Sequence, residues 1–111
     1  MREFIKLKSL TEVDDLVVGN LLSLVYISRV DCSVCHGLKP QVARLLEKYP
    51  LIAVGEVDAD EVPEIAGAFN IFTVPVLILF VEGKEYLREA RIVHMQLLEE
   101  RLDKVYEGVI F

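Results

Sequence analysis

Two cysteines three positions apart, Cys32 and Cys35, are the residues of this sequence best suited to chemistry. They are the chain's only cysteines, so they do not form the network of crosslinks that stabilises small secreted proteins. A thiol pair at this spacing can cycle between a dithiol and a disulfide by exchange with another disulfide, which requires no cofactor. We therefore expect a reactive pair rather than a structural one.

Two other interpretations of the cysteine pair are weaker. Free cysteines are often buried and inert, behaving as small apolar residues. Half of a zinc site would need further ligands, and the two histidines are His94 and His36, the latter adjacent to Cys35 and poorly spaced for chelation. No metal site is predicted, although an iron–sulfur cluster bridged between two chains stays open as an alternative.

Composition and charge narrow the class of protein. A length of 111 residues suits a single domain, residues 1–111. The formal charge of −6 disfavours binding to nucleic acid or to an anionic membrane surface. Charged residues appear too early for a secretory signal, and the longest apolar run, 74–81, has the length of a buried strand. We expect a cytoplasmic protein.

The hydrophobic pattern predicts strands and helices that alternate along the chain. The apolar run at 21–28 suits a central strand buried on both faces, and the cysteine pair follows it directly. Val34, Leu38 and Val42 then recur at helical spacing, so the pair opens a helix. Further strands are predicted at 4–7, 51–58, 76–81 and 85–90, and further helices over 9–18, 62–69 and 93–108. In the last helix the buried side is expected to hold Val93, Leu97, Leu98, Leu102 and Val105. This is an α/β fold, a mixed sheet of about five strands with four helices covering both faces.

The position of the pair at a helix start predicts different roles for the two sulfurs. Unpaired amide groups and the helix dipole favour a thiolate at Cys32, whereas Cys35, one turn later, is expected to be shielded from solvent. Asp31 should oppose the thiolate, while Arg29 and His36 should favour it if they lie close.

A set of short motifs accompanies the pair: Pro40 in the following helix, Thr73-Val74-Pro75 ahead of an apolar strand, and Glu82-Gly83-Lys84 after it. Together they resemble the thioredoxin family, in its small bacterial form, over nearly the whole chain. The resemblance implies the thioredoxin fold and a cis Val74–Pro75 peptide bond that faces the cysteines. It also implies a substrate groove, which Val34, Thr73, Val74 and Pro75 would line. The implied partners are disulfide-containing proteins or small thiols, and a thiol reductant or reductase.

The sequence departs from the family at several positions. Asp31 replaces the usual tryptophan, and Ser33-Val34 replaces the usual Gly-Pro between the cysteines. The family's buried aspartate and its neighbouring lysine are replaced by Tyr26 and Glu56. We hypothesise that Glu56, if buried behind Cys35, removes the proton from that thiol, with the Tyr26 hydroxyl close enough to hydrogen-bond this carboxylate.

The predicted function is thiol–disulfide exchange with proteins or small thiols. Cys32 would be the nucleophile and Cys35 the resolving thiol. The alternative is a binding or redox-sensing module that uses the same groove without turnover.

Overall fold

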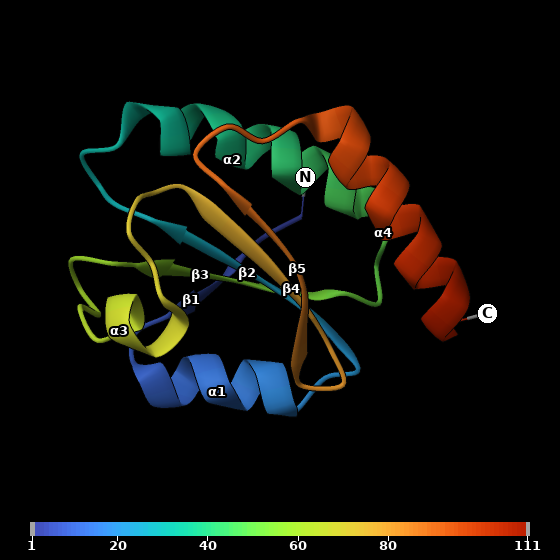
Figure 1. The fold of residues 1–111 in the computed structure, drawn as a ribbon, viewed down its shortest axis with the longest axis horizontal. Helices are drawn as coiled ribbons and strands as arrows, with labels where there is room; N and C mark the ends of the chain where they lie inside the picture. The colour runs from blue at the N-terminus through green and yellow to red at the C-terminus, as the bar shows by residue number, and fades with distance from the viewer. Residues whose placement is uncertain (1, 111) are drawn as a thin grey trace.

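The computed structural model describes residues 2–110 and shows an α/β sandwich around one mixed sheet (Figure 1). The sheet order is β1-β3-β2-β4-β5, in which β1, β3 and β2 are parallel while β4 and β5 are antiparallel to their neighbours. The elements are β1 Ile5–Leu7, α1 Leu10–Val18, β2 Leu22–Ser28, α2 Ser33–Leu45, a 3₁₀ turn Leu46–Lys48, β3 Ala53–Asp58, α3 Ile65–Phe69, β4 Val76–Val81, β5 Lys84–Ala90 and α4 Met95–Ile110. The predicted five-stranded mixed sheet with four helices is confirmed.

The two faces of the sheet form two separate apolar cores, because successive strand residues point to opposite sides. Helices α2 and α4 cover one face, and α1 and α3 cover the other (Figure 1). On β2, Leu24 and Tyr26 belong to the first core and Val25 and Ile27 to the second. β2 is therefore buried on both faces, as its continuous apolar run predicted.

Local signals place the ends of several elements. Ser9 caps α1, since its hydroxyl accepts from the Glu12 amide at 3.1 Å while the Glu12 carboxylate accepts from the Lys8 amide at 3.2 Å. This is the reciprocal arrangement of a capping box. Between β4 and β5, Glu82 and Gly83 have φ angles of 51° and 81°, which suit the tight turn of a hairpin.

Several boundary predictions differ from the structure. The third strand begins at Ala53 rather than residue 51. Helix α3 is restricted to Ile65–Phe69, because Val62 precedes Pro63 and the proline ring disfavours the helical conformation of the residue before it. Helix α4 begins at Met95 rather than residue 93, so Val93 precedes the helix, and it continues past Gly108 to Ile110.

The buried side of α4 also differs from the prediction. Leu98, Leu102, Val105 and Tyr106 are buried and follow a single helical stripe, whereas Leu97 lies outside that stripe and is 40% exposed. In the described range 2–110, none of the helices has the length and apolar character required to cross a bilayer.

Candidate active site

The cysteine pair lies at the junction between β2 and α2. Cys32 is the N-cap of α2, and its sulfur accepts a hydrogen bond from the Cys35 amide at 3.2 Å. The two residues form a disulfide, with their Cα atoms 5.3 Å apart. Cys32 is half-buried, while Cys35 is 1% exposed. The predicted difference in solvent access between the two sulfurs is confirmed.

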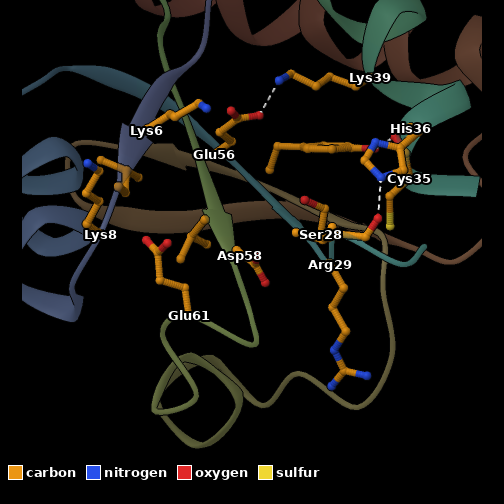
Figure 2. A pocket seen from close by; sticks show the side chains of 14 residues that line it. Lys6, Lys8, Ser28, Arg29, Cys35, His36, Lys39, Glu56, Asp58 and Glu61 are labelled. Carbon is orange, nitrogen blue, oxygen red and sulfur yellow. Dashed lines mark hydrogen bonds and ion pairs between the residues drawn. The ribbon is translucent and has the colours of Figure 1, made fainter. Parts of the chain in front are cut away.

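The loop between β2 and α2 is held by hydrogen bonds at both ends. The Cys32 amide donates to the Arg29 carbonyl at 3.2 Å, and the His36 ring donates through Nε2 to the Val30 carbonyl at 2.6 Å. Arg29 extends away from Cys35 in Figure 2 and forms a surface ion pair with Asp60 at 3.5 Å. This ion pair with Asp60 was not predicted from the sequence, which indicated only that Arg29 would favour the Cys32 thiolate if it lay close.

Pro75 lies at the same end of the sheet as the cysteines. Its successor Val76 is the register partner of Ile27, so Pro75 is placed beside the carboxyl end of β2, from which the cysteine loop departs. The Val74–Pro75 peptide bond is cis, as the family resemblance implied. The Pro75 carbonyl accepts from the Arg91 amide at 2.9 Å, which ties the loop before α4 to this region.

Apolar side chains are exposed around these loops. Val34 is 60% exposed, Phe72 is 94% exposed, and both Thr73 and Val74 are half-buried. Ile92, which is 74% exposed, directly follows Arg91, whose amide donates a hydrogen bond to the Pro75 carbonyl. Sequence reasoning missed Ile92, because no local signal ties a loop residue after β5 to a loop before β4.

A cavity of about 470 Å³ lies behind Cys35, between α2 and the strands β1, β2 and β3 (Figure 2). Charged side chains of both signs line it, in contrast to the apolar surface around Val34 and Phe72. Its charged residues are Lys6, Lys8, Arg29, Lys39, Glu56, Asp58 and Glu61, and its lining also includes Tyr26, Cys35 and His36.

Tyr26 contacts the active-site helix directly. Its side chain is fully buried, and its hydroxyl donates to the Cys35 carbonyl oxygen at 2.6 Å rather than to the Glu56 carboxylate as hypothesised. The Cys35 carbonyl is the nearer acceptor because it projects from the first turn of α2 over this face of β2. Burial, together with the negative charge of Glu56, raises the pKa of Tyr26 to about 12.

Glu56 projects into the cavity and forms an ion pair that was not predicted. Its Oε2 lies 2.5 Å from Lys39 Nζ, and its side chain retains 15% exposure. Lys39 is four residues after Cys35, a spacing that places the two on the same face of α2. That spacing is the signal by which Lys39 could have been found.

Metal-ligand side chains are not gathered anywhere in the described part of the chain. No group of three or more histidine, cysteine, aspartate or glutamate residues within 2–110 is arranged to hold an ion.

Comparison with known proteins decides the family. The Thioredoxin family model matches residues 8–104. The chain belongs to the thioredoxin family. It is 46% identical over 106 residues to the "Thioredoxin-like protein YdfQ" of Bacillus subtilis, covering 96% of this chain and 95% of that protein. It is 32% identical over 84 residues to "Thioredoxin-2" of Saccharomyces cerevisiae, covering 75% and 81% of the two chains.

Solved structures agree with this assignment. A mutant thioredoxin from Halobacterium salinarum superposes with a TM-score of 0.82 at 27% identity, covering 92% of this chain and 89% of that one. Oxidised mitochondrial thioredoxin 3 from Saccharomyces cerevisiae shares the fold, with a TM-score of 0.80 at 24% identity and coverages of 91% and 94%. Membership of the thioredoxin family and a cysteine pair at disulfide distance support thiol–disulfide oxidoreductase activity.

Proposed function

We propose that this chain works as a single domain that exchanges disulfides with proteins or small thiols. The observation that carries the proposal is the half-buried Cys32 at the N-cap of α2, with the buried Cys35 one turn behind it. A thiol reductant or a reductase would return the pair to its dithiol form. We place this cycle in the cytoplasm, where such reductants keep thiols reduced.

The proposed reaction has two exchange steps. The Cys32 thiolate attacks a partner disulfide, forming a mixed disulfide and releasing the first partner thiolate. Cys35 then loses its proton and attacks the Cys32 sulfur. The new Cys32–Cys35 bond replaces the bond from Cys32 to the partner, whose second sulfur leaves as a thiolate and takes a proton from water. The partner is reduced by two electrons and the cysteine pair is oxidised.

The substrate groove would be formed by loops at one end of the sheet. This end of the sheet holds four residues of the proposed groove: Val34, Thr73, Val74 and Pro75. Proline has no amide N–H, so it leaves hydrogen bonding to a partner's main chain to Thr73 and Val74. An extended segment carrying the target disulfide would pair with the main chain of Thr73 and Val74, while Val34 contributes apolar contact.

Proton removal from Cys35 is assigned to Glu56. The carboxylate and Cys35 line the same cavity, which is open to solvent and would return the proton to water. Tyr26 assists by holding the Cys35 main chain, since its hydroxyl donates to the Cys35 carbonyl oxygen.

The proposed steps can be separated with a symmetrical nitroaromatic disulfide that releases a coloured thiolate at each exchange. The reduced protein should give one phase whose rate rises with probe concentration, followed by one whose rate does not. Cys35→Ser should keep the first phase, lose the second, and accumulate covalent partners in cell extract. Cys32→Ser should lose both.

The double serine variant separates catalysis from binding. A catalyst loses all turnover when both cysteines are replaced. If the double variant instead retained a partner protein with unchanged affinity, and the wild type showed no turnover with any disulfide, the chain would be a binding or sensing module and the exchange function would be wrong.

A further inference from the structure

Lys39 lies where it can act on the proposed proton acceptor. It follows Cys35 by one helical turn on the same face of α2, and its side chain points into the cavity toward Glu56 (Figure 2). The ammonium nitrogen is 2.5 Å from Glu56 Oε2. The same element therefore supplies the resolving thiol and the cation that contacts the carboxylate.

The position of the Lys39 ammonium is fixed by a second contact. It lies 5.4 Å from the centroid of the Phe4 ring, within the range of a cation–π interaction. Phe4 in turn packs edge to face against Tyr26, with ring centroids 5.8 Å apart. A cluster of Phe4, Tyr26, Lys39 and Glu56, drawn from the N-terminal segment, β2, α2 and β3, thus adjoins Cys35.

We propose that Lys39 is a positioning residue for the second exchange step. Its ammonium holds the Glu56 carboxylate in the cavity behind Cys35, oriented to accept the thiol proton as Cys35 attacks the mixed disulfide. This inference rests on the role proposed above for Glu56, and it names Lys39 as the residue that holds Glu56 in place for that role.

The proton and electrons balance in this step. The Cys35 S–H bond breaks and its proton passes to a Glu56 oxygen, giving a neutral carboxyl that remains hydrogen-bonded to Lys39. The Cys35 sulfur then bonds to Cys32, and the electron pair of the broken mixed disulfide leaves on the partner sulfur. The carboxyl afterwards releases its proton to water in the cavity.

Other charged groups around the cavity do not make the same contact. Lys6 is the cross-strand neighbour of Glu56, but within the described structure its ammonium is outside ion-pair distance of the carboxylate. Arg29 pairs with Asp60, and His36 donates to a main-chain carbonyl. Lys8 carries the same charge as Lys39 and lines the same cavity, so it provides a matched control.

The test measures the second phase of thiolate release from the nitroaromatic probe at about pH 7. Lys39→Met should slow this phase about fivefold to tenfold, because a loosely held acceptor spends less time in the reactive geometry. Lys39→Arg should restore most of the rate, and Lys8→Met should match the wild type. The first phase, which uses Cys32 alone, should be unchanged and reports that each variant is folded.

A double-mutant cycle tests whether Lys39 acts through Glu56. In the Glu56→Gln background, Lys39→Met should add less than about a twofold further loss, because the group it positions is already absent. An equal loss in both backgrounds would overturn the inference, as would a wild-type second phase in Lys39→Met.

The two proposals fail in distinguishable ways. If Glu56→Gln slows the second phase while Lys39→Met does not, only the positioning role is wrong. If Glu56→Gln itself resolves at the wild-type rate, the proton-acceptor role is wrong and the inference falls with it.

Discussion

The two faces of the central sheet hold different kinds of groups. On the face covered by α2 and α4, polar side chains reach specific partners. The Tyr26 hydroxyl donates to the Cys35 carbonyl oxygen, and the Tyr49 hydroxyl donates to the Asp103 carboxylate. On the face covered by α1 and α3, the core is apolar, and the Ser23 hydroxyl, which is buried there, has no hydrogen-bond partner.

Residues on one strand therefore have different roles: those facing α2 can contact the active site, and those facing α1 and α3 belong to the apolar core. Tyr26 faces α2 and touches the active site, whereas Ser23, three residues earlier on β2, faces the opposite core. On β3, Glu56 likewise projects into the cavity while Gly55 meets side chains of the other core. Substitutions on the α1 and α3 face should therefore change stability alone, and those on the α2 face should change stability and reaction together.

Gly55→Ala should give the largest change in stability. An added Cβ would lie 2.6 Å from Leu7 Cδ1 and 2.9 Å from Leu16 Cδ2, so both side chains would have to shift. Overpacking of this kind costs about 2–3 kcal/mol of unfolding free energy. Urea unfolding measures the loss, and the rates of both exchange phases in the folded variant should equal those of the wild type.

Gly67→Ala is the matched control, since a Cβ there meets nothing within 4 Å and the residue lies in α3. It should be neutral or stabilising by up to about 1 kcal/mol. Slowed exchange in folded Gly55→Ala would show that the two faces are coupled, contrary to the separation argued above.

Tyr26→Phe should give the next largest change and should also affect the reaction. The substitution removes a buried hydrogen bond to the Cys35 carbonyl, which costs about 1–2 kcal/mol. The second exchange phase should slow, because the first turn of α2 is held less firmly. Tyr86→Phe, at a tyrosine that is 60% exposed, should change neither quantity.

The same substitution tests a pH dependence whose sign follows from the raised pKa. In the unfolded chain tyrosine loses its proton near pH 10, whereas burial and the charge of Glu56 raise the folded pKa of Tyr26 to about 12. The unfolded state therefore binds fewer protons across this window, and stability falls as pH rises. Between about pH 9 and about pH 11 the wild type should lose about 1 kcal/mol more than Tyr26→Phe. Parallel curves for the two proteins would contradict the assignment.

Much of the fold could be predicted from the sequence because the signals are local. Continuous apolar runs marked the buried strands β2 and β4, and the turn residues Glu82 and Gly83 marked the hairpin. The position of the cysteine pair at the start of α2 followed from the same pattern.

The partners of the polar groups could not be predicted in the same way, because they depend on tertiary contacts. The Lys39–Glu56 pair joins a helix to a strand, and the Tyr26 hydroxyl finds a main-chain carbonyl that no side-chain pattern reveals. Arg2 provides a further case, since its guanidinium donates to the carbonyl oxygens of Leu46, Tyr49 and Ile52. These bonds connect the N-terminal segment to the residues between α2 and β3.

Ser23→Ala should give the smallest change, and with the opposite sign. The Ser23 hydroxyl is buried in the apolar core without a hydrogen-bond partner, so it loses contact with water on folding and gains nothing in return. Alanine removes that cost while leaving only a small void, and the unfolding free energy should rise by about 0.5–1 kcal/mol with both exchange phases unchanged. Ser9→Ala is the matched control: its hydroxyl caps α1, so the same change of residue type should lower stability by about 1 kcal/mol. If Ser23→Ala destabilised the protein as Ser9→Ala does, the hydroxyl would have a bonding role, and the α1 and α3 face would not be the purely apolar support that distinguishes it from the other.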